Sequence, residues 1–118
     1  MEKVMIYTDG ACSRQSRSSG GWGAILMHGD YKKEISGGER QTTNNIMEIT
    51  AVIEALKQLK YACEVTVYSD SAYVVNAFLQ GWIYQWMKKN WKTAGNAPVK
   101  NRELWQELYE LTKKHKVE

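Results

Sequence analysis

The spacing of apolar residues changes partway along the chain, and the two spacings predict different secondary structures. Residues 1–8, 23–27 and 31–36 are short runs rich in β-branched and apolar residues, and turn residues bound each run. Runs of this kind predict three strands. Residues 12–21 form a loop by composition, and the short connection at 28–30 joins the second and third strands. A meander of three strands is therefore expected at the amino end.

Helical spacing begins after the meander. Met47, Ala51, Ala55 and Leu59 fall on one face of a helix, with Asn44 or Asn45 as its expected N-cap. A fourth strand is expected next, and further helical stretches follow it, interrupted at Gln80–Gly81. Their expected ranges are 64–69 for the strand and 73–78, 82–89 and 99–115 for the helices. Strands followed by alternating helix and strand predict an α/β fold with mixed strand directions.

Length and composition are those of an ordinary globular protein. At 118 residues, the chain is expected to be one domain over residues 1–118 with a single core. No apolar stretch approaches the roughly 18 residues of a membrane span, and no basic and then apolar leader is present, so we expect a cytoplasmic protein. Cys12 and Cys63 lack metal-site spacing and are expected to be reduced.

Charge is unevenly distributed along the chain. The formal net charge is +3, but residues 71–102 contain no acid and five basic residues, which are Lys88, Lys89, Lys92, Lys100 and Arg102. A basic face beside an acidic cluster suits a polyanion that is held near a metal ion. A solvated, lysine-rich face is the alternative explanation.

Three acidic residues stand at the boundaries of the predicted elements. Asp9 ends the first strand, Glu48 lies in the first turns of the first helix, and Asp70 follows the fourth strand. Each has an explanation of its own, because Asp–Gly favours a turn, an acid near a helix N-terminus suits the helix dipole, and an Asp before a helix can cap it.

Taken together, the three acids predict a metal site. If the first and fourth strands are parallel neighbours, Asp9 and Asp70 end at the same edge of the sheet, and the helix can bring Glu48 to that edge. None of the three has a Lys or Arg beside it in the sequence. Since clustered carboxylates repel one another, a bound divalent cation is a reason to keep them close.

Several segments in register resemble type 1 ribonuclease H. They are Tyr-Thr-Asp-Gly-Ala-Cys (7–12), Gly-Gly-Trp-Gly-Ala-Ile-Leu (20–26), Thr-Thr-Asn-Asn-Ile-Met-Glu (42–48), Ser-Asp-Ser-Ala-Tyr-Val (69–74), and the tail from Gly81 through Trp105. The resemblance covers essentially the whole chain. It implies a ribonuclease H-like sheet, in which an antiparallel three-strand meander is joined by a parallel fourth strand and flanked by helices.

The resemblance also implies an activity, which is hydrolysis of the RNA strand of an RNA–DNA hybrid with two divalent ions, Mg²⁺ or alternatively Mn²⁺. Asp9, Glu48 and Asp70 match three of the family's four metal-binding carboxylates. Two metals about 3.5–4 Å apart can activate a water and stabilise the leaving oxygen, so no cysteine or histidine nucleophile is needed.

Substrate-binding residues follow from the same match. The backbone around Gly10 and Cys12 and the amides of Asn44 and Asn45 are expected to meet ribose 2′-hydroxyls, which distinguish RNA from DNA. Thr43 and Asn101 match a phosphate pocket for the DNA strand.

Residues 81–92 resemble a basic protrusion that grips hybrids. Lys88, Lys89 and Lys92 would neutralise phosphates, and Trp91 is a candidate for contact with nucleic acid. Trp82 and Trp86 are expected to pack the helix pair, and capping is the alternative role for Asn44 and Asn45.

The sequence departs from the family in two places. The loop 13–19 carries Arg14 and Arg17 in place of the usual glycine- and proline-rich run. The chain also stops at Glu118, where the fifth strand would begin, so that strand, the loop histidine and the helix with the fourth carboxylate are expected to be missing.

Two functions remain open on these grounds. The chain is either a hybrid-cleaving endonuclease, or a non-catalytic hybrid-binding module or incomplete fragment that needs a partner segment. The family is expected to be monomeric, whereas an exposed edge of the fourth strand would allow an edge-to-edge dimer.

Overall fold

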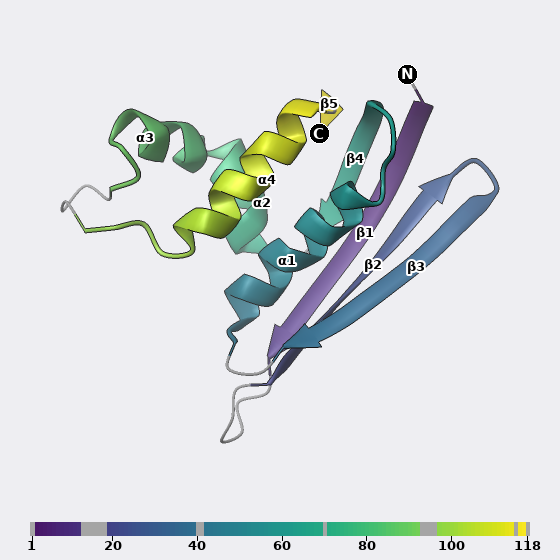
Figure 1. Cartoon of the computed structure of the whole chain (residues 1–118), viewed down its shortest axis with the longest axis horizontal. Helices are drawn as coiled ribbons and strands as arrows, with labels where there is room; N and C mark the ends of the chain where they lie inside the picture. Colours follow the sequence, from purple (N-terminus) through teal and green to yellow (C-terminus); the bar gives the residue numbers. More distant parts are fainter. Residues whose placement is uncertain are drawn as a thin grey trace.

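The computed structural model describes residues 2–12, 19–39, 42–69, 71–92, 97–114 and 116–117. These ranges contain strands β1 (Glu2–Cys12), β2 (Gly20–His28), β3 (Tyr31–Glu39), β4 (Cys63–Ser69) and β5 (Lys116–Val117), and helices α1 (Asn44–Lys57), α2 (Ala72–Leu79), α3 (Trp82–Lys88) and α4 (Arg102–Lys114) (Figure 1).

The strands form one mixed sheet in the order β3-β2-β1-β4-β5. β1 pairs antiparallel with β2, and β2 with β3, so the predicted meander is confirmed. β4 lies parallel to β1 on the other side, with Ile6 opposite Val67 and Thr8 opposite Ser69. The turn between β2 and β3 uses Gly29 at φ 58°, a backbone conformation that glycine adopts readily.

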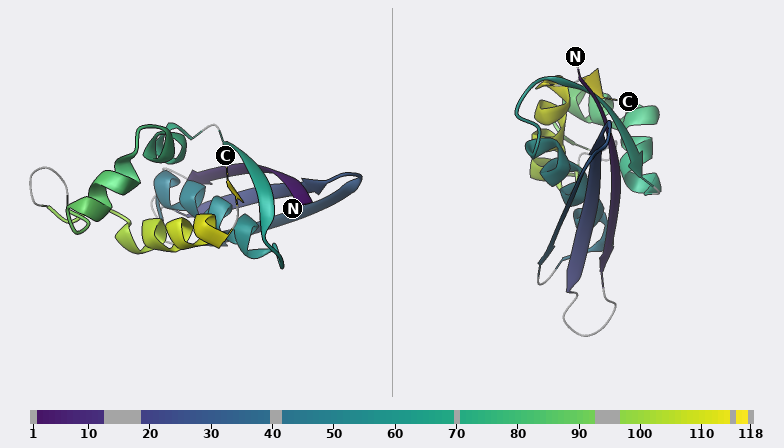
Figure 2. Two further views of the ribbon diagram at one scale, coloured as in Figure 1. Left: turned by 90° about the horizontal axis from the view of Figure 1, so that it is seen from above. Right: turned by 90° about the vertical axis from the view of Figure 1, so that its right-hand side faces the viewer.

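The core lies between the sheet and the helices that cover one of its faces. α1 packs on β1 and β2, and α4 packs against α1 (Figures 1 and 2). Ile6 and Val65 from the sheet, Ile53 and Leu56 from α1, and Trp105 from α4 are fully buried. Since successive strand residues point to opposite faces, the alternation that buries Val4 and Ile6 turns Met5 and Tyr7 outward, where both are exposed.

A chain of aromatic rings joins α3 to the rest of the molecule. Trp86 of α3 lies 6.3 Å from Trp82, 6.4 Å from Trp91 and 5.6 Å from Trp105, measured between ring centroids. Ring pairs at these separations stabilise packing beyond the area that they bury. The predicted packing role of Trp82 and Trp86 is therefore confirmed.

One ion pair joins α1 to α4 on the surface. The Nζ atom of Lys57 lies 2.8 Å from Oε1 of Glu107 and 3.3 Å from Oε1 of Glu54. The hydrogen bond to Glu107 raises the pKa of Lys57 above its usual value, partly offset by desolvation. Because both partners are largely exposed, water screens this pair and its contribution to stability is small.

Several expected boundaries are wrong, and local pairing explains each difference. β1 does not end at Asp9 but continues to Cys12, because pairing with β2 extends to Cys12 opposite Gly20. The N-cap of α1 is Thr43, whose Oγ1 accepts from the amide of Ile46 at 3.1 Å, so Asn44 and Asn45 lie inside the helix. The last helix begins at Arg102, after Val99 donates to the carbonyl of Trp91 at 3.1 Å.

The expectation that the fifth strand is missing is also wrong in part. Lys116 and Val117 pair in parallel with Glu64 and Val65 of β4. The edge of β4 offers main-chain donors and acceptors to the residues that follow α4, and these two residues use them.

Gly10 brings β1 and the start of α1 into van der Waals contact. A Cβ atom placed on Gly10 would lie 2.6 Å from the carbonyl carbon of Met47 and 2.7 Å from the amide nitrogen of Glu48. Both atoms belong to helix backbone, which cannot yield as a flexible side chain can. Only glycine therefore fits at this crossing without displacing α1.

We expect Gly10→Ala to destabilise the protein, because the added methyl must push α1 away from the sheet. Overpacking of this kind costs about 1–3 kcal/mol, which urea unfolding measures directly. Gly21→Ala is the control, since its Cβ would meet nothing nearer than 3.5 Å. Equal stability of Gly10→Ala and Gly21→Ala would contradict the close approach of β1 and α1.

Candidate active site and nucleic-acid interface

The last described pair of the ladder between β1 and β4 is Thr8 opposite Ser69, and Asp9 follows Thr8 directly. On the other side of β1, Asp9 is opposite Gly23 of β2. The Asp9 side chain is exposed. Since Asp9 is inside a strand, the explanation of Asp9–Gly10 as a turn is wrong.

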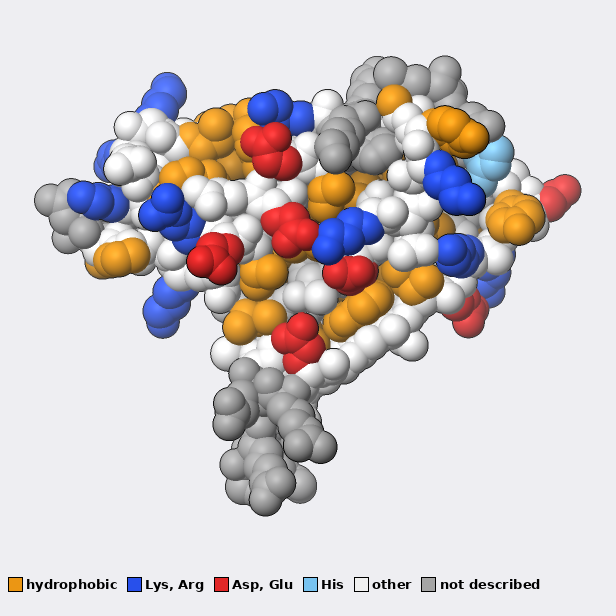
Figure 3. Space-filling model, viewed as in Figure 1, with side chains coloured by type: hydrophobic (Ala, Val, Ile, Leu, Met, Phe, Trp, Pro, Cys, Tyr) orange, Lys and Arg blue, Asp and Glu red, His pale blue; other side chains and the backbone are white. Residues whose placement is uncertain are grey.

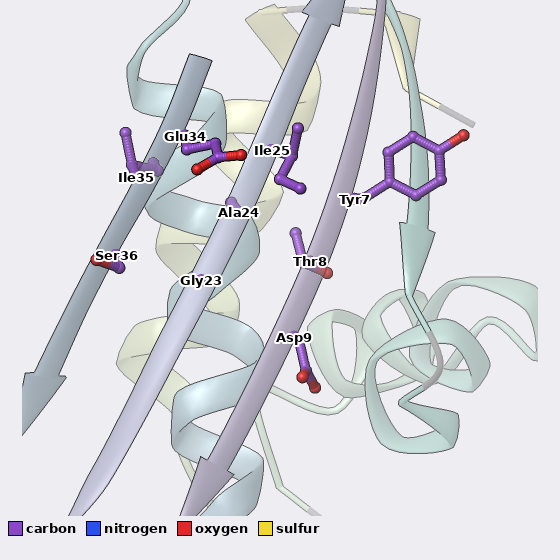
Figure 4. A pocket seen from close by; sticks show the side chains of 9 residues that line it. All are labelled: Tyr7, Thr8, Asp9, Gly23, Ala24, Ile25, Glu34, Ile35 and Ser36. Carbon is purple, nitrogen blue, oxygen red and sulfur yellow. The ribbon is translucent and has the colours of Figure 1, made fainter. Parts of the chain in front are cut away.

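A shallow hollow of about 560 Å³ opens on the sheet beside Asp9 (Figure 4). Gly23 lies between Asp9 and Ser36 in the cross-strand register and has no side chain to fill this place. Tyr7, Ile25 and Glu34 also line the hollow. The Asp9 carboxylate is thus open to solvent and to an incoming ion.

Glu48 is anchored by a serine from another element. The hydroxyl of Ser71 donates a hydrogen bond to Oε2 of Glu48, and the Ser71 hydroxyl oxygen accepts from the amide of Val74 at 3.2 Å. Ser71 is buried and Glu48 is partly buried. Glu48 lies beyond the first turn of α1, where interaction with the helix dipole has faded, so the dipole explains its position poorly.

Asp70 lies outside the described residues, but both of its neighbours are described. Ser69 pairs with Thr8, the residue before Asp9, and Ser71 bonds to Glu48. Ser71 is also the N-cap of α2, the place that the alternative explanation gave to Asp70. Among the residues that the structure describes, no three His, Cys, Asp or Glu side chains form a group able to hold a metal ion.

The oxygen atoms available here suit a hard cation. Asp9 and Glu48 offer carboxylate oxygens, and Gly10 lets the backbones of their two segments touch. Mg²⁺ and Mn²⁺ prefer such ligands over nitrogen or sulfur. The residues present therefore fit a divalent metal.

The residues predicted to bind nucleic acid fall into two groups. In the first, Asn44 and Asn45 are exposed at the N-terminal end of α1, and Thr43 caps that helix. Asn101 precedes α4 at φ 60°, and its Nδ2 donates to the hydroxyl of Tyr73 at 3.3 Å. Cys12 of β1 lies opposite Gly20 of β2, and the side chain of Cys12 lies outside the described part of the chain.

The second group lies at the end of the molecule that α3 forms. Lys88, Lys89 and Lys92 are exposed there, and Figure 3 shows basic side chains gathered at this end, away from most of the acids. Trp91 is partly buried and packs against the core, so only part of its ring is accessible.

The sequence does not predict the hydrogen bond from Ser71 to Glu48. The hydroxyl of the residue that follows Asp70 is its only signal in the sequence.

No helix in the described ranges is long and apolar enough to cross a membrane.

Comparison with known proteins gives consistent results. The sequence profile of the family described as RNase H matches residues 1–118. A ribonuclease H of Acetivibrio thermocellus is 59% identical over 117 residues, covering 99% of this chain and 79% of the relative. One of Clostridium botulinum is 57% identical over 119 residues, covering 99% and 80%.

Solved structures show the same fold. LC9-RNase H1, described as a type 1 RNase H with the type 2 active-site motif, matches with a TM-score of 0.85 at 27% identity, and the match covers all of this chain and 61% of that one. A foamy viral protease-reverse transcriptase in complex with RNA/DNA hybrid matches with a TM-score of 0.80 at 20% identity, covering 99% of this chain and 17% of that one, which is likeness of fold alone.

We expect Ser71 and Glu48 to be energetically coupled. In a double-mutant cycle of Ser71→Ala and Glu48→Ala, the unfolding free energies should deviate from additivity by about 1–2 kcal/mol, since hydrogen bonds to charged groups are worth about 1.5–3 kcal/mol before screening. Thr43→Ala with Glu48→Ala is the control cycle, because Thr43 caps α1 through the amide of Ile46. Additive effects of Ser71→Ala and Glu48→Ala would refute the bond.

Proposed function

This chain belongs to the ribonuclease H family, and we propose that it hydrolyses the RNA strand of RNA–DNA hybrids with two divalent ions held by Asp9, Glu48 and Asp70. Residues 1–118 act as one domain in this proposal, and its compartment is the cytoplasm. Mg²⁺ is the proposed ion, with Mn²⁺ as the substitute.

The observation that supports the proposal most strongly is the hydrogen bond from Ser71 to Glu48. Ser69 and Ser71 flank Asp70 in the sequence, and they connect respectively to the strand of Asp9 and to the side chain of Glu48. Asp9 lies inside β1, Glu48 lies beyond the first turn of α1, and Ser71 caps α2. These positions favour a shared role of the three acids at one site over three separate roles.

The chain's own residues supply orientation and charge. The three carboxylates would hold the ions, and Ser71 would fix the rotamer of Glu48 so that one of its oxygens stays available to a metal. When bound, such ions activate water and neutralise charge on the phosphate that is attacked. The open hollow beside Asp9 leaves room for a phosphate group.

Substrate selection would use the two groups of polar residues. Asn44 and Asn45, with the backbone of Gly10 and Cys12, would read ribose 2′-hydroxyls, which are absent from DNA. Thr43 and Asn101 would bind phosphates of the DNA strand and fix its register without reading bases. Lys88, Lys89 and Lys92, with the accessible part of Trp91, would grip the hybrid at the α3 end.

Hybrid binding without cleavage is the second candidate function, and it is favoured by one observation. The lysines at the α3 end are exposed, and Figure 3 shows basic side chains gathered at this end. Contact of these lysines with phosphates needs no metal ion. For either function we propose that the chain acts as a monomer, with an edge-to-edge dimer as the alternative state.

We expect Mg²⁺-dependent cleavage of the RNA strand of a labelled hybrid, and its loss in Asp70→Asn. The amide keeps the shape of the side chain but removes the charge that a metal requires. Asp30→Asn in the turn between β2 and β3 is the matched control and should cleave as the original chain does. Binding without cleavage at any Mg²⁺ or Mn²⁺ concentration would favour the second candidate and contradict the first.

We expect Lys88→Ala with Lys89→Ala to weaken hybrid binding and to flatten its salt dependence. For every phosphate that is no longer neutralised, the slope of log K against log salt concentration should fall by about 0.9. Fluorescence anisotropy over a salt series measures that slope. The double variant Lys32→Ala and Lys60→Ala removes equal charge elsewhere and should keep the original slope. Equal slopes for all three proteins would exclude hybrid binding by the lysines at the α3 end.

A further inference from the structure

The hydroxyl group of Tyr73 joins α2 to the beginning of α4. Its oxygen accepts one hydrogen bond from Nδ2 of Asn101 at 3.3 Å and another from Nε1 of Trp105 at 3.2 Å. The rings of Tyr73 and Trp105 also pack together, with 5.1 Å between their centroids. One oxygen atom therefore contacts both a residue of the core and a residue of the proposed nucleic-acid interface.

Trp105 fixes the place of this hydroxyl. The Trp105 side chain is fully buried. Its indole N–H can only donate, so it needs an acceptor inside the protein. Tyr73 supplies that acceptor. Packing in the core thus sets the position of the Tyr73 hydroxyl, whether or not Asn101 is bound to it.

Asn101 stands at the beginning of α4 in an unusual backbone conformation. Its φ is 60°, which asparagine adopts more readily than most other residues, and its carbonyl oxygen accepts from the amide of Trp105 at 3.0 Å. The side-chain amide of an asparagine carries two N–H groups, and Tyr73 binds one of them. The other N–H is then held in a defined direction.

A hollow of about 620 Å³ lies beside Asn101. Arg102, Glu103, Leu104 and Gln106 line it as well. Asn101 is partly buried and Arg102 is exposed, so both side chains are within reach of a ligand from solvent. The start of a helix and the charge of Arg102 favour an anion here, whereas the carboxylate of Glu103 opposes one. The hollow has room for a phosphate group of a nucleic acid.

We propose that Tyr73 is a positioning residue for Asn101, and that its hydroxyl holds the Asn101 amide so that one N–H faces a phosphate of the DNA strand. This inference rests on the proposed function, in which Asn101 binds such a phosphate. Without the hydroxyl, the amide loses its partner and can rotate, and some of its orientations turn the Oδ1 atom toward the phosphate and repel it. Ordering the amide before the substrate arrives lowers the entropic cost of binding.

Hybrid binding without divalent metal, measured by fluorescence anisotropy, tests this role. We expect Tyr73→Phe to weaken binding by about two- to tenfold, the range for losing the pre-ordering of one polar side chain. Asn101→Ala should weaken it at least as much, and the double variant no more than Asn101→Ala alone, because Tyr73 acts through Asn101. Tyr109→Phe is the matched control, since its ring lies on α4 against Tyr84, and it should bind as the original chain does.

A second readout separates positioning from stability, because Tyr73→Phe also leaves the indole N–H of Trp105 without its acceptor. Uncharged methylphosphonates replace the phosphates of the DNA strand one at a time. We expect one replacement to weaken binding by the original chain strongly, by Tyr73→Phe less, and by Asn101→Ala little. Equal affinity of Tyr73→Phe and the original chain, or equal sensitivity of the two proteins to every replacement, would overturn the proposal.

Failure of this inference is distinguishable from failure of the proposed function. If Asn101→Ala weakens hybrid binding and Tyr73→Phe does not, the role of Tyr73 is wrong and the phosphate contact of Asn101 stands. If neither variant changes hybrid binding, both the phosphate contact and the role of Tyr73 are wrong. Neither result bears on cleavage, which the Mg²⁺-dependent assay of Asp70→Asn tests separately.

Discussion

The contact between Gly10 and the first turns of α1 is the constraint on which the rest of the site depends. With no side chain at this position, β1 passes against the backbone of Met47 and Glu48. The residue before Gly10 is Asp9, and Glu48 itself bears the second carboxylate. A larger residue would separate the two elements and with them the two acids, so the fold and the site share one steric requirement.

Much of this arrangement could be predicted from the sequence. Alternating and helical spacing identified the meander and the order of the elements, because burial on one face imposes these periods. The predictions that were wrong concern the ends of single strands and helices. Pairing with β2 carries β1 past Asp9 to Cys12, and a hydroxyl at Thr43 caps α1 one residue before the asparagines. These outcomes depend on neighbouring strands and on competition between nearby capping residues, which the spacing of apolar residues does not encode.

The sequence predicts which residues form the candidate site, but it does not predict the contacts between them. The sequence placed Asp9, Glu48 and Asp70 at the ends of elements, but the bond from Ser71 to Glu48 depends on how α2 packs beside α1. The partial burial of Trp91 against Trp86 likewise requires the bend at Asn90 and Trp91, where φ is 55° and 60°. The same packing leaves Lys88 and Lys89 exposed at the α3 end.

The central claim is that the carboxylates of Asp9, Glu48 and Asp70 form one metal site. Paramagnetic broadening of ¹H–¹⁵N resonances by substoichiometric Mn²⁺ tests it most directly, because broadening falls steeply with distance from the ion. The account predicts that the amides of Gly10, Glu48 and Ser71 broaden together, and that Asp70→Asn reduces the effect at all three. Broadening confined to exposed acids elsewhere, such as Asp30 and Glu110, would contradict it.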